Sequence, residues 1–231
     1  METVFPSHEQ AVVPVVGTTA VFPVHRIYCV GQNYSAHVRE MGGDPTKTQP
    51  VFFSKPSDAI VINDSPISYP MSTANLHFEA ELVVALKHGG VRLNAEQAQA
   101  CVFGYGVGVD FTRRDLQANC KAKGQPWDIA KGFDQSAPIS AIKPLVDCNN
   151  IDSARIWLSV DDVLKQDANT DDMIWDVPSI IAELSSYFEL KAGDLIFTGT
   201  PSGVDAVSAG NCVRAGIDGV GELTVNILKG E

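Results

Sequence analysis

An uninterrupted apolar run at residues 82–86, Leu-Val-Val-Ala-Leu, restricts the fold more than any other feature of the sequence. A short run of this kind predicts a buried strand. Two acids, Glu79 and Glu81, lie one residue apart just before this segment. Because alternate side chains of a strand point to one face, we expect both carboxylates to emerge together where the strand enters the core.

A third acid, Asp110, ends a second apolar segment at residues 107–110. Carboxylates held close together in a partly buried place repel each other, and a divalent cation allows all of them to stay ionised. Three carboxylates without a nearby pair of cysteines are suited to a hard metal, Mg²⁺ or Mn²⁺ before Zn²⁺. The alternative is that these are ordinary strand-end acids in water, which is the common meaning of an isolated Glu-x-Glu.

Length and charge exclude several classes of protein. A chain of 231 residues that is 45% hydrophobic is suited to one globular domain with a full core. Its formal net charge of −11 disfavours nucleic acid and anionic membranes as partners, because both are bound through basic surfaces. A dianionic substrate would need a locally positive site on this acidic molecule.

Cysteine usage and the N-terminal segment point to the cytoplasm. The chain has five cysteines: Cys29, Cys101, Cys120, Cys148 and Cys212. Their number is odd and no two have C-x-x-C spacing, which predicts reduced thiols in place of a disulfide or zinc framework. The apolar stretch at residues 11–24 is interrupted by two prolines and a glycine. It is too short and broken for a signal peptide or a membrane span.

The order of the expected elements argues against a doubly wound α/β fold, because strands outnumber helices and do not alternate with them. We expect an extended or β-rich N-terminal strap at residues 1–24, and strands at residues 26–30, 51–53, 59–62, 195–197 and 223–228. A hairpin is expected around Asp161-Asp162, between residues 156–160 and 163–165. Helices are expected at residues 34–41 (capped by Asn33 or Ser35), 94–102 (capped by Asn94) and 178–188.

Six motifs together resemble the fumarylacetoacetate hydrolase superfamily, in its short acylpyruvase branch. They lie at residues 28–42, 52–56, 79–81, 108–117, 131–134 and 194–204, and the resemblance runs from about Phe22 to the C-terminus. Within that branch the motifs look most like the bacterial fumarylpyruvate hydrolases. The resemblance implies an α+β, mainly β fold, the mixed β-sandwich roll of this superfamily, with residues 25–231 as a single catalytic domain and a homodimer as the usual assembly.

A second constellation is the pair His37 and Glu40, three residues apart on the expected short helix. Side chains at this spacing can touch, and a carboxylate beside an imidazole makes it a better general base. A random pair of this kind is more often a surface contact. Here the surrounding motif resembles the catalytic dyad of the superfamily, which implies that the pair activates water.

The resemblance assigns further roles to single residues. It implies that Arg114, Gln117 and Lys131 contact the carboxylate and keto oxygens of an acylpyruvate, and that Thr200 contacts its pyruvate carboxylate. Lys55 also matches a motif, without a clear role. His77 is in phase with the two glutamates and is expected to support the metal site without binding the ion. One departure is Gln32, where many relatives carry Arg or Lys; it leaves the preferred acyl group open.

The expected function is a metal-dependent hydrolase that cleaves the carbon–carbon bond of acylpyruvates, with fumarylpyruvate giving fumarate and pyruvate in aromatic-acid degradation. Glu79, Glu81 and Asp110 would bind the metal, His37 and Glu40 would activate water, and Lys131 would stabilise the pyruvate enolate. Two alternatives stay open: an oxaloacetate decarboxylase or tautomerase that uses the same site, and a catalytically silent metal-binding scaffold dimer.

Overall fold

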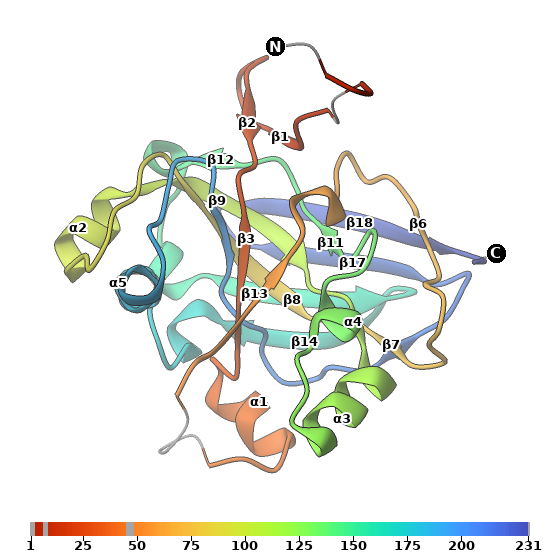
Figure 1. Ribbon diagram of the computed structural model, residues 1–231. Coiled ribbons are helices and arrows are strands. Elements are labelled where there is room, and N and C mark those ends of the chain that lie inside the picture. The colour runs from red at the N-terminus through yellow and green to blue at the C-terminus, as the bar shows by residue number, and fades with distance from the viewer. Residues whose placement is uncertain (1–2, 7–8, 45–48, 231) are drawn as a thin grey trace.

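The computed structural model describes residues 3–6, 9–44 and 49–230. Two large sheets form its centre (Figure 1). The first has six strands in the order β12-β9-β8-β15-β3-β4. Their bounds are β3 Ile27–Gly31, β4 Val51–Lys55, β8 Ala80–Leu86, β9 Val102–Val109, β12 Lys143–Pro144 and β15 Leu195–Phe197. Strand β15 runs parallel to β3, and the other neighbours in this sheet are antiparallel.

The second sheet has five strands in the order β14-β13-β17-β18-β6. Their bounds are β6 Ile67–Ser68, β13 Arg155–Val160, β14 Val163–Asn169, β17 Cys212–Ile217 and β18 Gly221–Leu228. Strands β13, β17 and β18 pack against β8 and β9 of the first sheet. The hairpin expected around Asp161 and Asp162 joins β13 to β14, and both residues have positive φ, 49° and 62°, as a tight hairpin turn requires.

Three small sheets and five helices complete the fold over the residues that the structure describes. The small sheets are β1 (Val12–Pro14) with β2 (Val21–Pro23); β5 (Ile60–Val61) with β11 (Ala137–Pro138); and β7 (Leu76–His77) between β10 (Thr112–Arg113) and β16 (Ala206–Val207). The helices are α1 Ser35–Glu40, α2 Ala95–Ala100, α3 Arg114–Lys123, α4 Asp128–Lys131 and α5 Val177–Tyr187. Short 3₁₀ turns lie at Ser57–Ala59, Leu145–Asp147, Ile151–Ser153 and Thr170–Asp172.

Strand β8 lies between two hydrophobic clusters, which explains why all seven of its residues are buried. Leu82, Val84 and Leu86 point into the larger cluster, between the two sheets. Val83 and Ala85 point the other way, into a cluster that the β1–β2 hairpin helps to cover. The buried strand expected at residues 82–86 is therefore confirmed, and its two faces serve two separate parts of the core.

Helix capping is confirmed at one helix and corrected at another. Asn94 caps α2, and Gln97 returns a bond to the Asn94 backbone. The cap expected from Asn33 or Ser35 is wrong, because the N-cap of α1 is Tyr34 and no side chain caps it. The Asn33 side chain instead binds Trp175 and Thr198, which lie 142 and 165 residues away along the chain. The Asn33 side chain therefore forms long-range hydrogen bonds and does not cap the helix.

The α+β, mainly β class is confirmed. The division into a strap at residues 1–24 and a domain at residues 25–231 stays a prediction, and residues 1–2, 7–8, 45–48 and 231 lie outside the described part of the chain. Within the described residues, no helix has the length and apolar character needed to cross a bilayer.

Candidate active site

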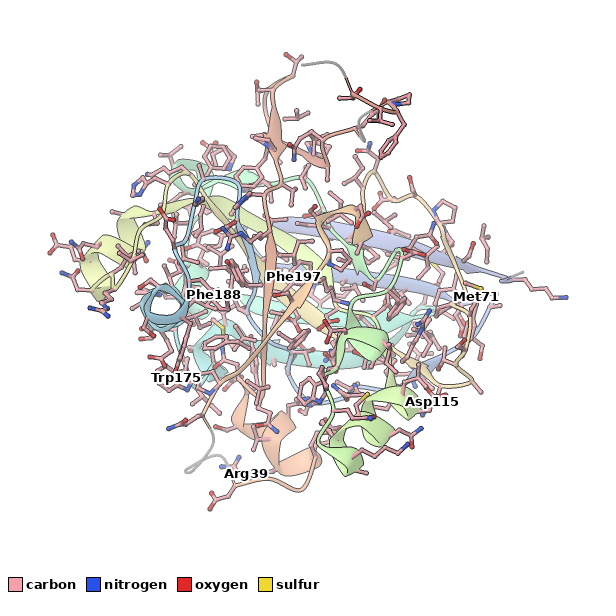
Figure 2. The ribbon with its side chains drawn as sticks, viewed as in Figure 1. Arg39, Met71, Asp115, Trp175, Phe188 and Phe197 are labelled. Atoms are coloured by element: carbon pink, nitrogen blue, oxygen red, sulfur yellow. The ribbon has the colours of Figure 1, made fainter. Side chains whose placement is uncertain are left out.

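The three acids meet where β8 and β9 pair. Gly108 of β9 lies opposite Glu81, and one step further the Asp110 amide donates to the Glu79 carbonyl at 2.8 Å. This register places the three acids on one face of the six-stranded sheet, the face of Val83 and Ala85. Figure 2 shows Phe197 of β15 in the middle of the molecule. A Cβ on Gly108 would lie 2.5 Å from the Phe197 ring, so the lack of a side chain at Gly108 leaves room for that ring.

The three acids Glu79, Glu81 and Asp110, called the triad below, have a geometry suited to a divalent cation. One oxygen from each of Glu79, Glu81 and Asp110 lies within 4.8 Å of the others, and the exposed fractions of these residues are 6%, 1% and 0%. An all-oxygen, buried and anionic donor set is the kind that binds Mg²⁺ or Mn²⁺. The triad can therefore hold a hard divalent metal, as the sequence predicted.

Three cations surround the three carboxylates. Lys131 Nζ lies 2.7 Å from both Glu79 Oε2 and Asp110 Oδ2, and Arg114 Nη2 lies 2.6 Å from Glu79 Oε1. Lys55, whose side chain is fully buried, pairs with Asp110 Oδ1 at 2.8 Å. The charges of these six side chains sum to zero when all are ionised, so a divalent cation would make the site positive by two units. That local charge is what an anionic substrate needs on a molecule with a net charge of −11.

The surroundings shift the pKa values of Glu81, Glu79 and Lys131 in different directions. Burial raises the pKa of Glu81 well above its usual value, and Asp110 and Glu79 raise it further. Burial also acts to raise the pKa of Glu79, but Lys131 and Arg114 outweigh it and lower that pKa below its usual range. Burial alone would lower the pKa of Lys131, yet Asp110 and Glu79 raise it to about 12. Lys131 is thus held as an ammonium ion beside the carboxylates.

Helix α1 brings the dyad over the triad. His37 is buried and lines the same cavity as Glu79 and Glu81, and its Nδ1 lies 3.1 Å from Glu40 Oε2. The Gly203 amide donates to both Glu40 oxygens, at 3.1 and 3.3 Å. The Nδ1 contact leaves Nε2 of His37 as the ring nitrogen that can accept a proton. The structure therefore brings the dyad and the acids together.

The other expected contact residues also line this cavity. Arg114 Nη1 donates to Gln117 Oε1 at 2.7 Å, which fixes both side chains on α3. The Thr200 hydroxyl accepts from Gln166 Nε2 at 2.8 Å. Arg114, Gln117, Thr200 and Lys131 all border the cavity, as does Gln32, which has a positive φ of 65°. Figure 2 shows Arg39 of α1 and Asp115 of α3 in the lower part of the molecule, and both helices contribute residues to the cavity.

The sequence predicted no role for several residues that lie near the site. Lys55 pairs directly with Asp110, although its motif gave no role. Gln166 is fully buried, and it joins the Ala80 amide at the start of β8 to Thr200 and Pro201. Its only sequence signal is an amide between Lys165 and Asp167, which predicts nothing. Lys121 and Trp127 line the cavity and had no assigned role.

His77 does not reach the triad by hydrogen bonding. Its Nε2 lies 2.9 Å from Asn75 Oδ1, and no ion pair joins it to a carboxylate in the described part of the chain. Partial burial lowers the pKa of His77, and Arg114 lowers it further. The supporting role expected for His77 stays a prediction.

Comparisons with known proteins identify relatives along almost the whole chain. The family model described as fumarylacetoacetate (FAA) hydrolase C-terminal matches residues 26–228. An oxaloacetate tautomerase of rat mitochondria, FAHD1, is 43% identical over 88% of this chain and 91% of its own length. A fumarylpyruvate hydrolase of a Ralstonia species is 39% identical over 81% of this chain and 97% of its own.

A solved structure has the same fold. It is the fumarylpyruvate hydrolase of Pseudomonas aeruginosa in complex with Mn²⁺ and pyruvate. The TM-score is 0.97 and the identity 44%, and the match covers 99% of this chain and all of the other. The sandwich roll expected from the sequence motifs is thereby confirmed.

Proposed function

The chain belongs to the fumarylacetoacetate hydrolase family, and from that membership we propose that it is a metal-dependent hydrolase of acylpyruvates. Its proposed substrate is fumarylpyruvate and its products are fumarate and pyruvate. The similarity to fumarylpyruvate hydrolases from two bacteria supports this choice, and one of these was crystallised with pyruvate. The proposal also places the reaction in the degradation of aromatic acids.

One observation carries the hydrolytic proposal: a buried histidine, bonded to a carboxylate, faces the same cavity as the acidic triad. Hydrolysis of a carbon–carbon bond needs a base that makes a nucleophile from water. A buried imidazole with a fixed tautomer serves as that base. A site that only stabilised an enolate would not need a base to activate water.

Each residue of the site has a separate role in the proposed hydrolysis. Arg114, Gln117 and Thr200 hold the pyruvyl end of the substrate. His37 Nε2 takes a proton from water, Glu40 stabilises the imidazolium, and the hydroxide adds to the distal carbonyl carbon. The bond between that carbon and the neighbouring methylene then breaks, and its electron pair becomes the enolate of pyruvate. Lys131 stabilises the enolate, which is protonated to pyruvate.

A divalent cation on Glu79, Glu81 and Asp110 would supply Lewis-acid polarisation of the keto and carboxylate oxygens. We propose Mn²⁺ or Mg²⁺ as that cation. The Mn²⁺ in the similar structure from Pseudomonas aeruginosa supports the first of these.

The second candidate function is decarboxylation or tautomerisation of oxaloacetate. The observation that favours it is the 43% identity to the rat oxaloacetate tautomerase, which is close to the 44% identity to the solved hydrolase. Both reactions pass through an enolate of an α-keto acid, and the same triad and lysine would serve them. Neither needs an activated water molecule, although tautomerisation still needs a base to move a proton, so the dyad discriminates between hydrolysis and decarboxylation.

Two further properties are proposed with the function. We propose the cytoplasm as the compartment, and the five unpaired cysteines in the structure support it. We also propose a homodimer, the usual assembly in this family. The remaining alternative, a silent metal-binding scaffold, has no need for the dyad or for Lys131, and turnover of any acylpyruvate would exclude it.

A substrate panel tests the proposal. Fumarylpyruvate, acetylpyruvate and oxaloacetate are compared at saturating Mg²⁺ or Mn²⁺, with a chelator-treated sample as the control. We expect fumarylpyruvate to be cleaved with the highest kcat/KM, the chelator to abolish turnover, and either metal to restore it. Full activity of the metal-free protein would exclude the triad as the site, and a kcat/KM highest for oxaloacetate would select the second candidate.

A further inference from the structure

Among the described residues, one cationic side chain that lines the cavity over the triad forms no ion pair with an acid. Of the described lining residues, Arg114, Lys121 and Lys131 carry positive charge, while Gln32 is neutral. Arg114 and Lys131 are bound to the triad. Lys121 forms no ion pair within the described residues, so its charge is available to a ligand.

Helix α3 carries Lys121 outward from the triad along one face. Arg114, Gln117 and Lys121 follow each other at intervals of three and four residues, which places them in one stripe. Arg114 contacts Glu79, and Gln117 is almost fully buried beside it. Seven residues of helix rise roughly 10 Å, so Lys121 lies two turns beyond the point where Arg114 meets the triad.

Two aromatic rings lie between the triad and this end of the helix. Lys121 Nζ is 5.0 Å from the centre of the Trp127 ring, and the Trp127 and Phe53 ring centres are 5.8 Å apart. On the other side, Lys131 Nζ is 4.9 Å from the Phe53 ring. Phe53 and Trp127 border both the cavity over the triad and an adjoining hollow. An apolar wall therefore connects the catalytic lysine to Lys121.

We propose that Lys121 binds the distal carboxylate of a dicarboxylic acyl group, and that Phe53 and Trp127 pack against the carbon chain between the two charged ends. This inference rests on the proposed function and names the class of acyl group that the site takes. A fumaryl group has both features, a planar unsaturated chain and a terminal carboxylate. An acetyl group has neither, and oxaloacetate is too short to present a carboxylate beyond the aromatic pair.

The electrostatic surroundings of Lys121 agree with this placement. Desolvation lowers the pKa of its ammonium, Arg114 and Lys131 lower it further, and Glu79 acts in the opposite direction. Lys121 is thus within the field of the catalytic charges although its side chain is exposed to solvent. A carboxylate beside it would relieve the repulsion from the two other cations.

The kinetic test compares Lys121→Met with Lys123→Met, a lysine on the same helix that is exposed and does not border the cavity. We expect Lys121→Met to lower kcat/KM for fumarylpyruvate by roughly tenfold, mainly through KM, because it removes one partly solvated charge pair. Acetylpyruvate, which has no distal carboxylate, should be cleaved as by the wild type. Lys121→Arg should restore most of the loss, and Lys123→Met should change neither substrate. Equal effects of Lys121→Met on both substrates would overturn the proposal.

A binding test separates this inference from the proposed reaction. The Mn²⁺-loaded protein is titrated by calorimetry with 2-oxoheptanedioate and with 2-oxoheptanoate, which share the α-keto acid end and the chain length of fumarylpyruvate. We expect the wild type to prefer the dicarboxylate by roughly tenfold and Lys121→Met to lose that preference. Loss of the preference without turnover of any acylpyruvate would keep Lys121 as the carboxylate site and reject the hydrolase. An unchanged preference in Lys121→Met would reject Lys121 whatever the enzyme catalyses.

Discussion

At the scale of single residues, the three acids of the triad have different surroundings. Asp110 contacts two lysines, and Glu79 contacts a lysine and an arginine. Glu81 accepts from the Gly199 amide and forms no ion pair with a cation of the described residues. The sequence predicted the three acids because Glu79, Glu81 and Asp110 flank apolar runs. It gave no partner for Lys55, because the pairing with Asp110 arises from the arrangement of strands far apart in the chain.

These different surroundings lead to a prediction that separates metal binding from stability. Glu81→Gln should lose the metal without loss of stability in chelator, because it removes a charge that burial and two acids disfavour. Asp110→Ala should also lose the metal, and in addition lower the free energy of unfolding by about 3 kcal/mol, since it leaves Lys55 without a carboxylate. Metal content by elemental analysis and urea denaturation in chelator measure the two effects. Equal stability of the two variants would contradict this account of the charges.

At the scale of elements, the site depends on contacts between segments that are distant in sequence. Helix α1 is joined through Glu40 to Gly203, and Gln166 of β14 joins the start of β8 to the loop that carries Thr200. Individual strands and helices could be predicted, because apolar runs and caps such as Asn94 are local signals. The bonds of Asn33 and Gln166 could not, because a buried amide selects its partners only after the chain has folded.

The dyad on α1 gives a prediction that distinguishes the two candidate reactions. His37→Ala and Glu40→Gln should each lower kcat for acylpyruvate hydrolysis by about 10²–10⁴-fold, the usual contribution of a general base. Any decarboxylation of oxaloacetate should fall much less. Glu40→Gln keeps an oxygen that can accept from the Gly203 amide, so α1 should stay in place. Both rates are measured with bound metal checked; equal losses would mean that the pair orders the site without activating water.

The Gln166 contact gives a second prediction at this scale. Gln166→Leu should lower the free energy of unfolding by about 2 kcal/mol, because the buried Ala80 amide and Pro201 carbonyl lose their partner. It should also raise KM more than it lowers kcat, since the Thr200 hydroxyl is no longer held. Lys165→Met, at the exposed neighbouring position, is the control and should change stability by under about 1 kcal/mol. A Gln166→Leu variant with wild-type stability and KM would show that Thr200 is positioned by other contacts.

At the scale of the whole molecule, the excess of strands argued against a doubly wound fold and the family resemblance implied the sandwich roll, but local patterns did not predict the relative placement of the sheets. Which face of β8 meets the second sheet depends on packing between β8 and β13, segments about 70 residues apart along the chain. That choice puts Glu79 and Glu81 on the face away from the sandwich interior, where α1 and α3 cover them. The result is a positive site, once a divalent cation is bound, on a molecule with a net charge of −11.

Because the metal-bound site is positive and the molecule as a whole is negative, kcat/KM should depend on the salt concentration. A dianionic acylpyruvate is repelled by the distributed surface charge at long range and attracted by Lys131, Arg114 and the bound cation at short range. The screening length falls from about 30 Å at 0.01 M salt to about 10 Å at 0.1 M, which removes the long-range repulsion before it weakens contacts inside the cavity. We therefore expect kcat/KM for fumarylpyruvate to rise roughly two- to threefold over this range, with a smaller rise for monoanionic acetylpyruvate and no change in kcat. Steady-state kinetics in potassium chloride measure this, and a falling kcat/KM would mean that the site charge, not the surface charge, governs the approach of the substrate.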